Sequence, residues 1–117
     1  MFYAAAFNNA PQQIGLAVSN DGIHWQRCSD KPFLTNGLPG EWNESESGHP
    51  CVYRDKQGQT HLFYQGNNTK GKNWMLTSVP LKWTKQGPQV RTDNRKSGNL
   101  SKGIIVVEHY DLGDFPL

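Results

Sequence analysis

Residues 14–25 read IGLAVSNDGIHW, and this stretch decides the fold class. An apolar run at Ile14–Ser19 is followed by Asn20-Asp21-Gly22 and then by a second β-forming run at His24–Cys28. An Asp-Gly pair between two such runs is the strongest short-range signal for a β-hairpin. The stretch therefore predicts two antiparallel strands joined by a tight turn.

The rest of the chain has the same sequence pattern: short apolar or alternating runs lie between turn residues, and there is no long helical periodicity. Further strands are predicted at Phe2–Phe7, Cys51–Asp55, His61–Gln65, Trp74–Val79, Lys82–Lys85 and Gly103–His109. The 12 glycines and 7 prolines suit frequent turns, and the 11 % aromatic content suits layers filled by flat rings. The sequence therefore predicts an all-β fold.

The hairpin pattern occurs twice, with matched positions about sixty residues apart. In each copy a Phe-Tyr pair begins a strand, an Asn-Asn pair follows, and a further strand leads to Trp25 or to Trp83. That spacing is close to the length of one four-stranded propeller blade with its connections. The second copy has all four predicted strands, whereas the first begins at its second strand.

These copies predict one partial propeller domain over residues 1–117, built of four-stranded antiparallel blades. Residues 2–34 form an incomplete first blade, 35–90 a complete second blade, and 91–117 the start of a next blade or a tail. A partial propeller has open strand edges and an uncovered inter-blade face. We therefore expect self-association or a truncated gene product, and a single compact β-sandwich is the competing arrangement.

Residues 14–25 and His61–Asn67 also resemble a known family. The first stretch is similar to a recurring hairpin of glycoside hydrolase family 43 and its relatives in families 32, 62, 68, 117 and 130. The second, preceded by Gly48–Asp55, resembles strands of the same five-bladed propellers. The resemblance covers roughly residues 2–90, and it is more specific for the fold than for one activity.

The resemblance implies two carboxyl groups astride a glycosidic bond, one acting as acid and the other as base or nucleophile. Related propellers place an Asp before the proline that opens an inner strand, but this chain has His49 before Pro50. The nearest replacement is Glu46, with Glu44 a weaker candidate, and either could equally be a solvated loop acid. Glu46 is therefore the predicted catalytic carboxyl and His49 a catalytic positioning group that donates to a sugar hydroxyl or a carboxylate, although His49 could instead make only a structural hydrogen bond.

Flat rings and amides near these residues are the predicted substrate contacts. Trp42 lies in a Gly/Pro-rich loop, where its ring could stack on the C–H face of a sugar. The other predicted contacts are Tyr64, Gln65, Asn67 and Trp74. Core packing is the alternative for all the rings.

Composition excludes several other classes. The formal net charge is +2 without a basic stripe, which argues against nucleic acid as a partner. No apolar run reaches membrane-spanning length, and no signal peptide is expected at the start. The sequence does not predict a cellular compartment. The histidines lack metal-ligand spacing, so no metal and no cofactor are predicted, although some related propellers hold calcium near the axis. Cys28 and Cys51 could form a disulfide, but two buried thiols are favoured.

Three functions follow from the sequence. The first is a glycoside-hydrolase-like propeller that hydrolyses or binds arabinose-, xylose- or fructose-containing glycans. The second is a non-catalytic carbohydrate-binding remnant without a full acid pair. The third is a structural β domain used for assembly, in which every aromatic ring belongs to the core.

Overall fold

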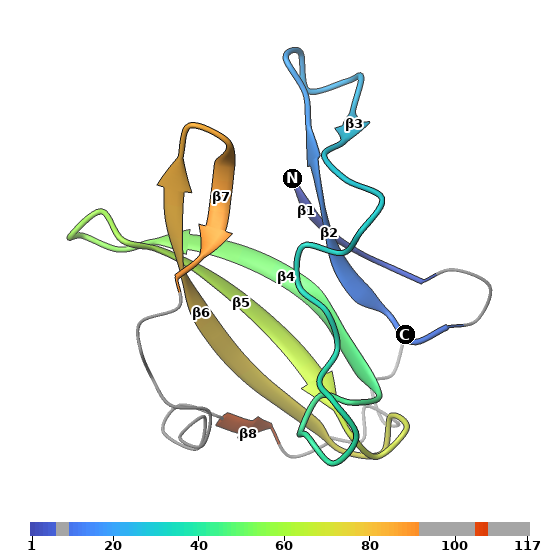
Figure 1. Cartoon of the computed structure of the whole chain (residues 1–117). Helices are drawn as coiled ribbons and strands as arrows, with labels where there is room; N and C mark the ends of the chain where they lie inside the picture. Colours follow the sequence, from blue (N-terminus) through green and yellow to red (C-terminus); the bar gives the residue numbers. More distant parts are fainter. Residues whose placement is uncertain (7–9, 92–104, 108–117) are drawn as a thin grey trace, which may run out of the picture.

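The structure is a computed structural model, and it describes residues 1–6 and 10–91 together with the backbone of 105–107. Within these residues all regular structure is β-strand and there is no helix. The prediction of an all-β fold is therefore confirmed. The strands form two antiparallel sheets, and the described residues do not close into a propeller (Figure 1).

The first sheet has three strands in the order β1-β2-β3. These are β1 (Phe2–Ala5), β2 (Gln13–Val18) and β3 (Gln26–Arg27). Between β2 and β3, Asp21 Oδ1 accepts hydrogen bonds from the backbone N–H groups of Ile23 and His24 at 2.9 and 2.8 Å. Gly22 has a φ of 74°, which only glycine adopts at no steric cost. The predicted hairpin is confirmed, with a shorter second strand.

The second sheet contains a four-stranded meander in the order β4-β5-β6-β7. The strands are β4 (Glu46–Arg54), β5 (Thr60–Asn67), β6 (Trp74–Thr84) and β7 (Gly87–Val90). The turn between β4 and β5 lies between the predicted strands Cys51–Asp55 and His61–Gln65. Its backbone is held by Asp55 Oδ1, which accepts from the N–H groups of Gln57 and Gln59 at 3.0 and 2.8 Å.

The predicted division between Trp74–Val79 and Lys82–Lys85 is wrong, because both belong to the single strand β6. Pro80 interrupts the pattern in the sequence but not in the sheet. Its carbonyl accepts from the backbone N–H of Arg91 at 2.8 Å, so its missing N–H faces away from β5 and no β5–β6 hydrogen bond is lost. The true fourth strand is β7, which follows a two-residue loop at Lys85-Gln86. Gly87, with a φ of 106°, completes that turn.

The two chain segments that share the repeat both form antiparallel meanders, β1-β2-β3 and β5-β6-β7. Their proposed tryptophan equivalence is wrong in detail. Trp25 precedes β3, whereas Trp83 lies inside β6 and pairs with Pro88. Both rings are exposed, with 45 % and 61 % of their surface accessible.

The sheets meet where the β1–β2 hairpin lies against β4, as Figure 1 shows. The backbone N–H of Ser47 donates to the carbonyl of Gln12 at 3.0 Å, which joins the outer edge of β4 to the start of β2. The most deeply buried apolar side chains are Ile14 in the first sheet and Leu62 in the second, both 0 % exposed. Burial of these side chains is the main force that holds each sheet together.

Part of the predicted run Gly103–His109 is described. The segment Ile105–Val107 forms β8, which pairs with β6 at Trp74–Leu76 and so joins the second sheet. The rest of that run, the Asn8-Asn9 pair and, apart from Arg91, the other residues of the predicted tail lie outside the described residues.

Cys28 and Cys51 are both free and both exposed. The expectation of buried thiols is therefore wrong. Cys28 follows the short strand β3, where neither sheet covers it, and Cys51 lies on the outer face of β4 just after an irregularity in the strand.

Candidate functional site

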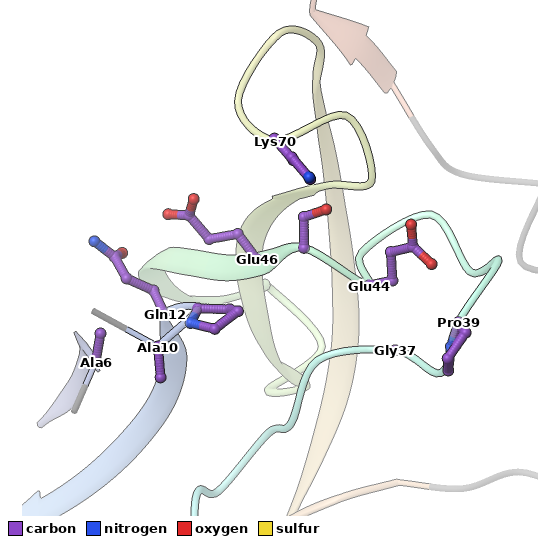
Figure 2. Close-up of a pocket in the computed structure, with 10 residues that line it drawn as sticks. Ala6, Ala10, Gln12, Gly37, Pro39, Glu44, Glu46 and Lys70 are labelled. Carbon is purple, nitrogen blue, oxygen red and sulfur yellow. The ribbon is translucent and has the colours of Figure 1, made fainter. Parts of the chain in front are cut away.

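An open hollow of about 680 Å³ lies where the start of β4 meets the entry to β2 and the loop of residues 37–45. Figure 2 shows its walls, to which Lys70 comes from the loop after β5. The polar side chains that line it are Gln12, Glu44, Ser45, Glu46 and Lys70. We refer to this hollow as the Glu46 pocket.

Glu46 is the first residue of β4 and one wall of this pocket. Within the described residues, its carboxylate has no hydrogen-bond or ion-pair partner. The Glu46 and Gln12 side chains approach each other above Gly48. A Cβ on Gly48 would lie 2.8 Å from Gln12 Oε1 and 3.7 Å from Glu46 Oε1. The absence of a side chain at Gly48 therefore leaves room for both polar groups.

Glu44 lines the same pocket, but its carboxylate is already engaged. Oε2 accepts a hydrogen bond from the backbone N–H of Gly40, and Glu41 Oε2 accepts in the same way from Leu38 at 2.7 Å. Both acids thus fix the fold of the loop that precedes β4. Glu46 is the acid in the pocket with its oxygens free to meet a ligand.

His49 lies outside the pocket, at a β-bulge. The register of β4 against β5 shifts between Gly48 and Cys51, and His49 has a φ of 49°, uncommon for a residue with a side chain. The bulge turns the exposed ring toward Gln65, and His49 Nδ1 and Gln65 Nε2 are hydrogen-bonded. The ring also meets Trp74 edge-on, with the centroids 6.5 Å apart. His49, Gln65 and Trp74 therefore form one cluster on the outer side of the bulge.

Trp42 and Tyr64 are packed together on the opposite face of β5, with ring centroids 5.7 Å apart. Tyr64 is only 6 % exposed, and burial raises the pKa of its hydroxyl to about 12. A Cβ on Gly66 would lie 2.8 Å from Trp42 Cζ3, so the indole covers the backbone of that glycine. Tyr64 is thus buried and Trp42 half-buried against it, and a sugar contact by either ring stays a prediction.

Asn67 is fully buried and organises the loop between β5 and β6. Its Oδ1 accepts from the backbone N–H groups of Thr69 at 3.3 Å and Gly71 at 2.9 Å. Its Nδ2 has no partner among the described residues. Asn67 therefore supports the loop that carries Lys70 to the pocket.

The structure thus separates the predicted site residues into four places. Glu46 is in the pocket, and His49 with Gln65 and Trp74 is beyond the bulge. Trp42 packs on Tyr64 over β5, and Asn67 is buried at the end of that strand. Sequence reasoning missed Gln12, Ser45 and Lys70. Ser45 adjoins a predicted residue, but nothing local marks Gln12 or Lys70. The contact between the two sheets brings Gln12 near Glu46, and the pairing of β4 with β5 brings the Lys70 loop there.

Within the described residues, no group of three or more His, Cys, Asp or Glu side chains could hold a metal ion. The same part of the chain has no helix able to cross a membrane. Comparisons with protein-family models, with curated proteins and with solved structures find no match to this chain.

Proposed function

We propose that this chain is a carbohydrate-binding part of a β-propeller that resembles glycoside hydrolase family 43. Its ligand is an arabinose-, xylose- or fructose-containing glycan, and the Glu46 pocket receives it. The resemblance at residues 14–25 and 61–67 supports the propeller assignment. So does the meander β4-β5-β6-β7, because a propeller blade has four antiparallel strands.

The observation that carries the proposal is the carboxylate of Glu46, unpaired among the described residues, in an open pocket between the two sheets that also presents Gln12 and Lys70. Sugars are recognised by side chains that exchange hydrogen bonds with several hydroxyl groups. A carboxylate accepts such bonds, a lysine donates them and a glutamine amide does both. Glu46, Lys70 and Gln12 supply all three kinds of group around one hollow.

Binding is favoured over hydrolysis by the chain alone, because hydrolysis needs a second acid opposite the first. Glu44 lines the pocket, but its carboxylate holds the backbone of Gly40. Hydrolysis is nevertheless the second candidate, since two carboxylates share one hollow. In that case self-association of several copies would cover the open sheet edges and could supply the missing acid.

The test is calorimetric titration of the full chain with xylohexaose, arabinohexaose and an inulin-type fructan hexamer. We expect Glu46→Gln to weaken binding of the preferred glycan about tenfold, because a hydrogen bond to a charged group contributes ~1.5–3 kcal/mol. Gly48→Ala should also weaken it, since the added methyl group fills the space between Gln12 and Glu46. Glu41→Gln is the matched control, because Glu41 does not line the pocket and the new amide oxygen can still accept from the Leu38 N–H that holds the loop.

Loss of binding in Glu46→Gln and Gly48→Ala, with Glu41→Gln unchanged, supports the proposal. Equal affinity in all three variants, or no binding of any of the three glycans, overturns it. Release of nitrophenol from aryl arabinofuranoside or aryl xyloside, abolished by Glu46→Gln, would instead select hydrolysis. The molecular mass in solution then shows whether the active species contains several copies.

A further inference from the structure

A second hollow, of about 310 Å³, lies on the first sheet. It is lined by side chains from all three strands of that sheet and from the loop after β3. The residues that matter are Tyr3, Gly15, Arg27, Ser29, Asp30 and Lys31. Nothing in the family resemblance assigns a role to any of them.

The floor of this hollow is an aromatic ring laid across a neighbouring strand. Tyr3 in β1 is the direct cross-strand partner of Gly15 in β2. A Cβ on Gly15 would lie 2.4 Å from Tyr3 Cζ, so the ring can take this position only because residue 15 is glycine. The next pair on the same face is Ala5 with Gln13, so a small side chain continues the floor.

The rim of the hollow offers both hydrogen-bond donors and acceptors. Arg27 Nη2 is paired with Asp30 Oδ1 at 3.0 Å, and the side chain of Asp30 is 92 % exposed. Ser29 Oγ accepts from the backbone N–H of Lys31 at 2.9 Å, which fixes the loop. In the part of the chain that the structure describes, Asp30 Oδ2 and Lys31 Nζ have no partner. One free acceptor and one free donor therefore stand beside the ring.

We propose that this hollow is a second carbohydrate-binding site, which takes one neutral pentose or hexose unit of a glycan. The C–H face of the sugar lies on the Tyr3 ring, where it removes apolar area from water at low entropy cost. The sugar hydroxyls donate to Asp30 and accept from Lys31. Asp30 neutralises Arg27, so the rim keeps the single positive charge of Lys31, and inorganic phosphate is therefore included in the test. This inference does not depend on the Glu46 pocket.

The experiment is titration of the ¹⁵N-labelled full chain with the same three hexasaccharides, followed through backbone amide shifts. The amide of Gly15 reports on the second hollow, and the amide of Gly48 reports on the Glu46 pocket. Tyr3→Ala should weaken the binding seen at Gly15 about five- to tenfold, whereas Tyr3→Phe, which keeps the ring, should retain it. Tyr53→Ala is the matched control, because Tyr53 is an exposed tyrosine on β4 outside the hollow.

Saturable sugar-induced shifts at Gly15 that Tyr3→Ala weakens and Tyr53→Ala does not would support the inference. Shifts confined to the Gly48 amide would overturn the second site and leave the proposed function standing. Shifts confined to the Gly15 amide would support the second site and contradict the proposed role of the Glu46 pocket. Saturable shifts at Gly15 from inorganic phosphate but not from any hexasaccharide would also overturn the second site. If Tyr3→Ala does not fold, Asp30→Asn takes its place, and unchanged affinity in that variant counts against the site.

Discussion

Trp42 lies directly over Gly66, so close that a Cβ on the glycine would meet the indole Cζ3 at 2.8 Å. The same Cβ would lie 2.6 Å from the backbone oxygen of Glu46. Neither group can move freely, because one is a packed ring and the other belongs to β4. This contact fixes the loop that enters β4 against β5, and so it sets where Glu46 begins the strand.

Gly66→Ala should therefore destabilise the protein. The added methyl group forces the Trp42 ring or the β4 backbone to shift, and overpacking of this kind costs about 1–3 kcal/mol. Urea unfolding followed by circular dichroism measures the loss. Gly48→Ala is the control, because its new methyl group meets only the movable end of the Gln12 side chain and should cost less than about 1 kcal/mol. Equal losses in the two variants would contradict the role of the Trp42 contact.

Asn67→Ala should also lower the free energy of unfolding, by about 1–3 kcal/mol. The substitution removes the side-chain oxygen that accepts hydrogen bonds from the backbone N–H groups of Thr69 and Gly71 in the loop after β5. Asn68→Ala, next in the chain and exposed, should stay within about 0.5 kcal/mol of the wild type. The comparison uses the same urea titration, and an equal effect at both positions would show that Asn67 does not hold the loop.

Stability should fall on acidification below about pH 4. The hydrogen bond from His61 to Asp55 at 3.0 Å lowers the pKa of the Asp55 carboxyl below its ordinary value of 3.8. Because the folded-state pKa is the lower one, this stabilisation is present above pH 3.8 and is lost as the pH falls through the folded value. The hydrogen bond with His24 likewise lowers the pKa of the Asp21 carboxyl, so Asp21 also loses its stabilising contribution at low pH.

Asp55→Asn should reduce the acid-side loss, measured as the urea midpoint at pH values from 2 to 7. A part of the loss should remain from Asp21. His61→Gln should give a smaller reduction, because it removes the largest cause of the lowered Asp55 pKa while the backbone N–H groups of Gln59 and Gln57 still lower it. A wild-type pH profile in both variants would show that the Asp55–His61 pair does not contribute.

Both thiols should react with Ellman's reagent in the folded protein, because Cys28 and Cys51 are free and exposed. We expect two equivalents per chain without denaturant, and the rates should be close to those in urea. Cys28→Ser and Cys51→Ser should each remove one equivalent with little change in stability. Protection of either thiol until unfolding would place it in an interface or in the interior.

The sequence by itself determined the all-β class, the turn at Asp21-Gly22 and most strands. These features depend on neighbours along the chain, such as the oxygen of Asp21 and the backbone N–H of Ile23. Local reasoning failed at Pro80, because a proline ends a strand only when its missing N–H faces a partner strand, and that is decided by the sheet. It failed again at Lys85-Gln86, a two-residue turn without Asn-Gly or Asp-Gly.

Only the tertiary structure decided which candidate residues share a site. The bulge at His49 directs its ring to Gln65 and away from Glu46, and no local pattern specifies that shift of register. Packing against Gly66 left the Trp42 ring half-buried over β5, while the contact of β4 with the residue before β2 brought Gln12 beside Glu46. The alternation of a strand sets the face of each side chain, but contacts between distant segments decide whether that face meets solvent, a sheet or a pocket.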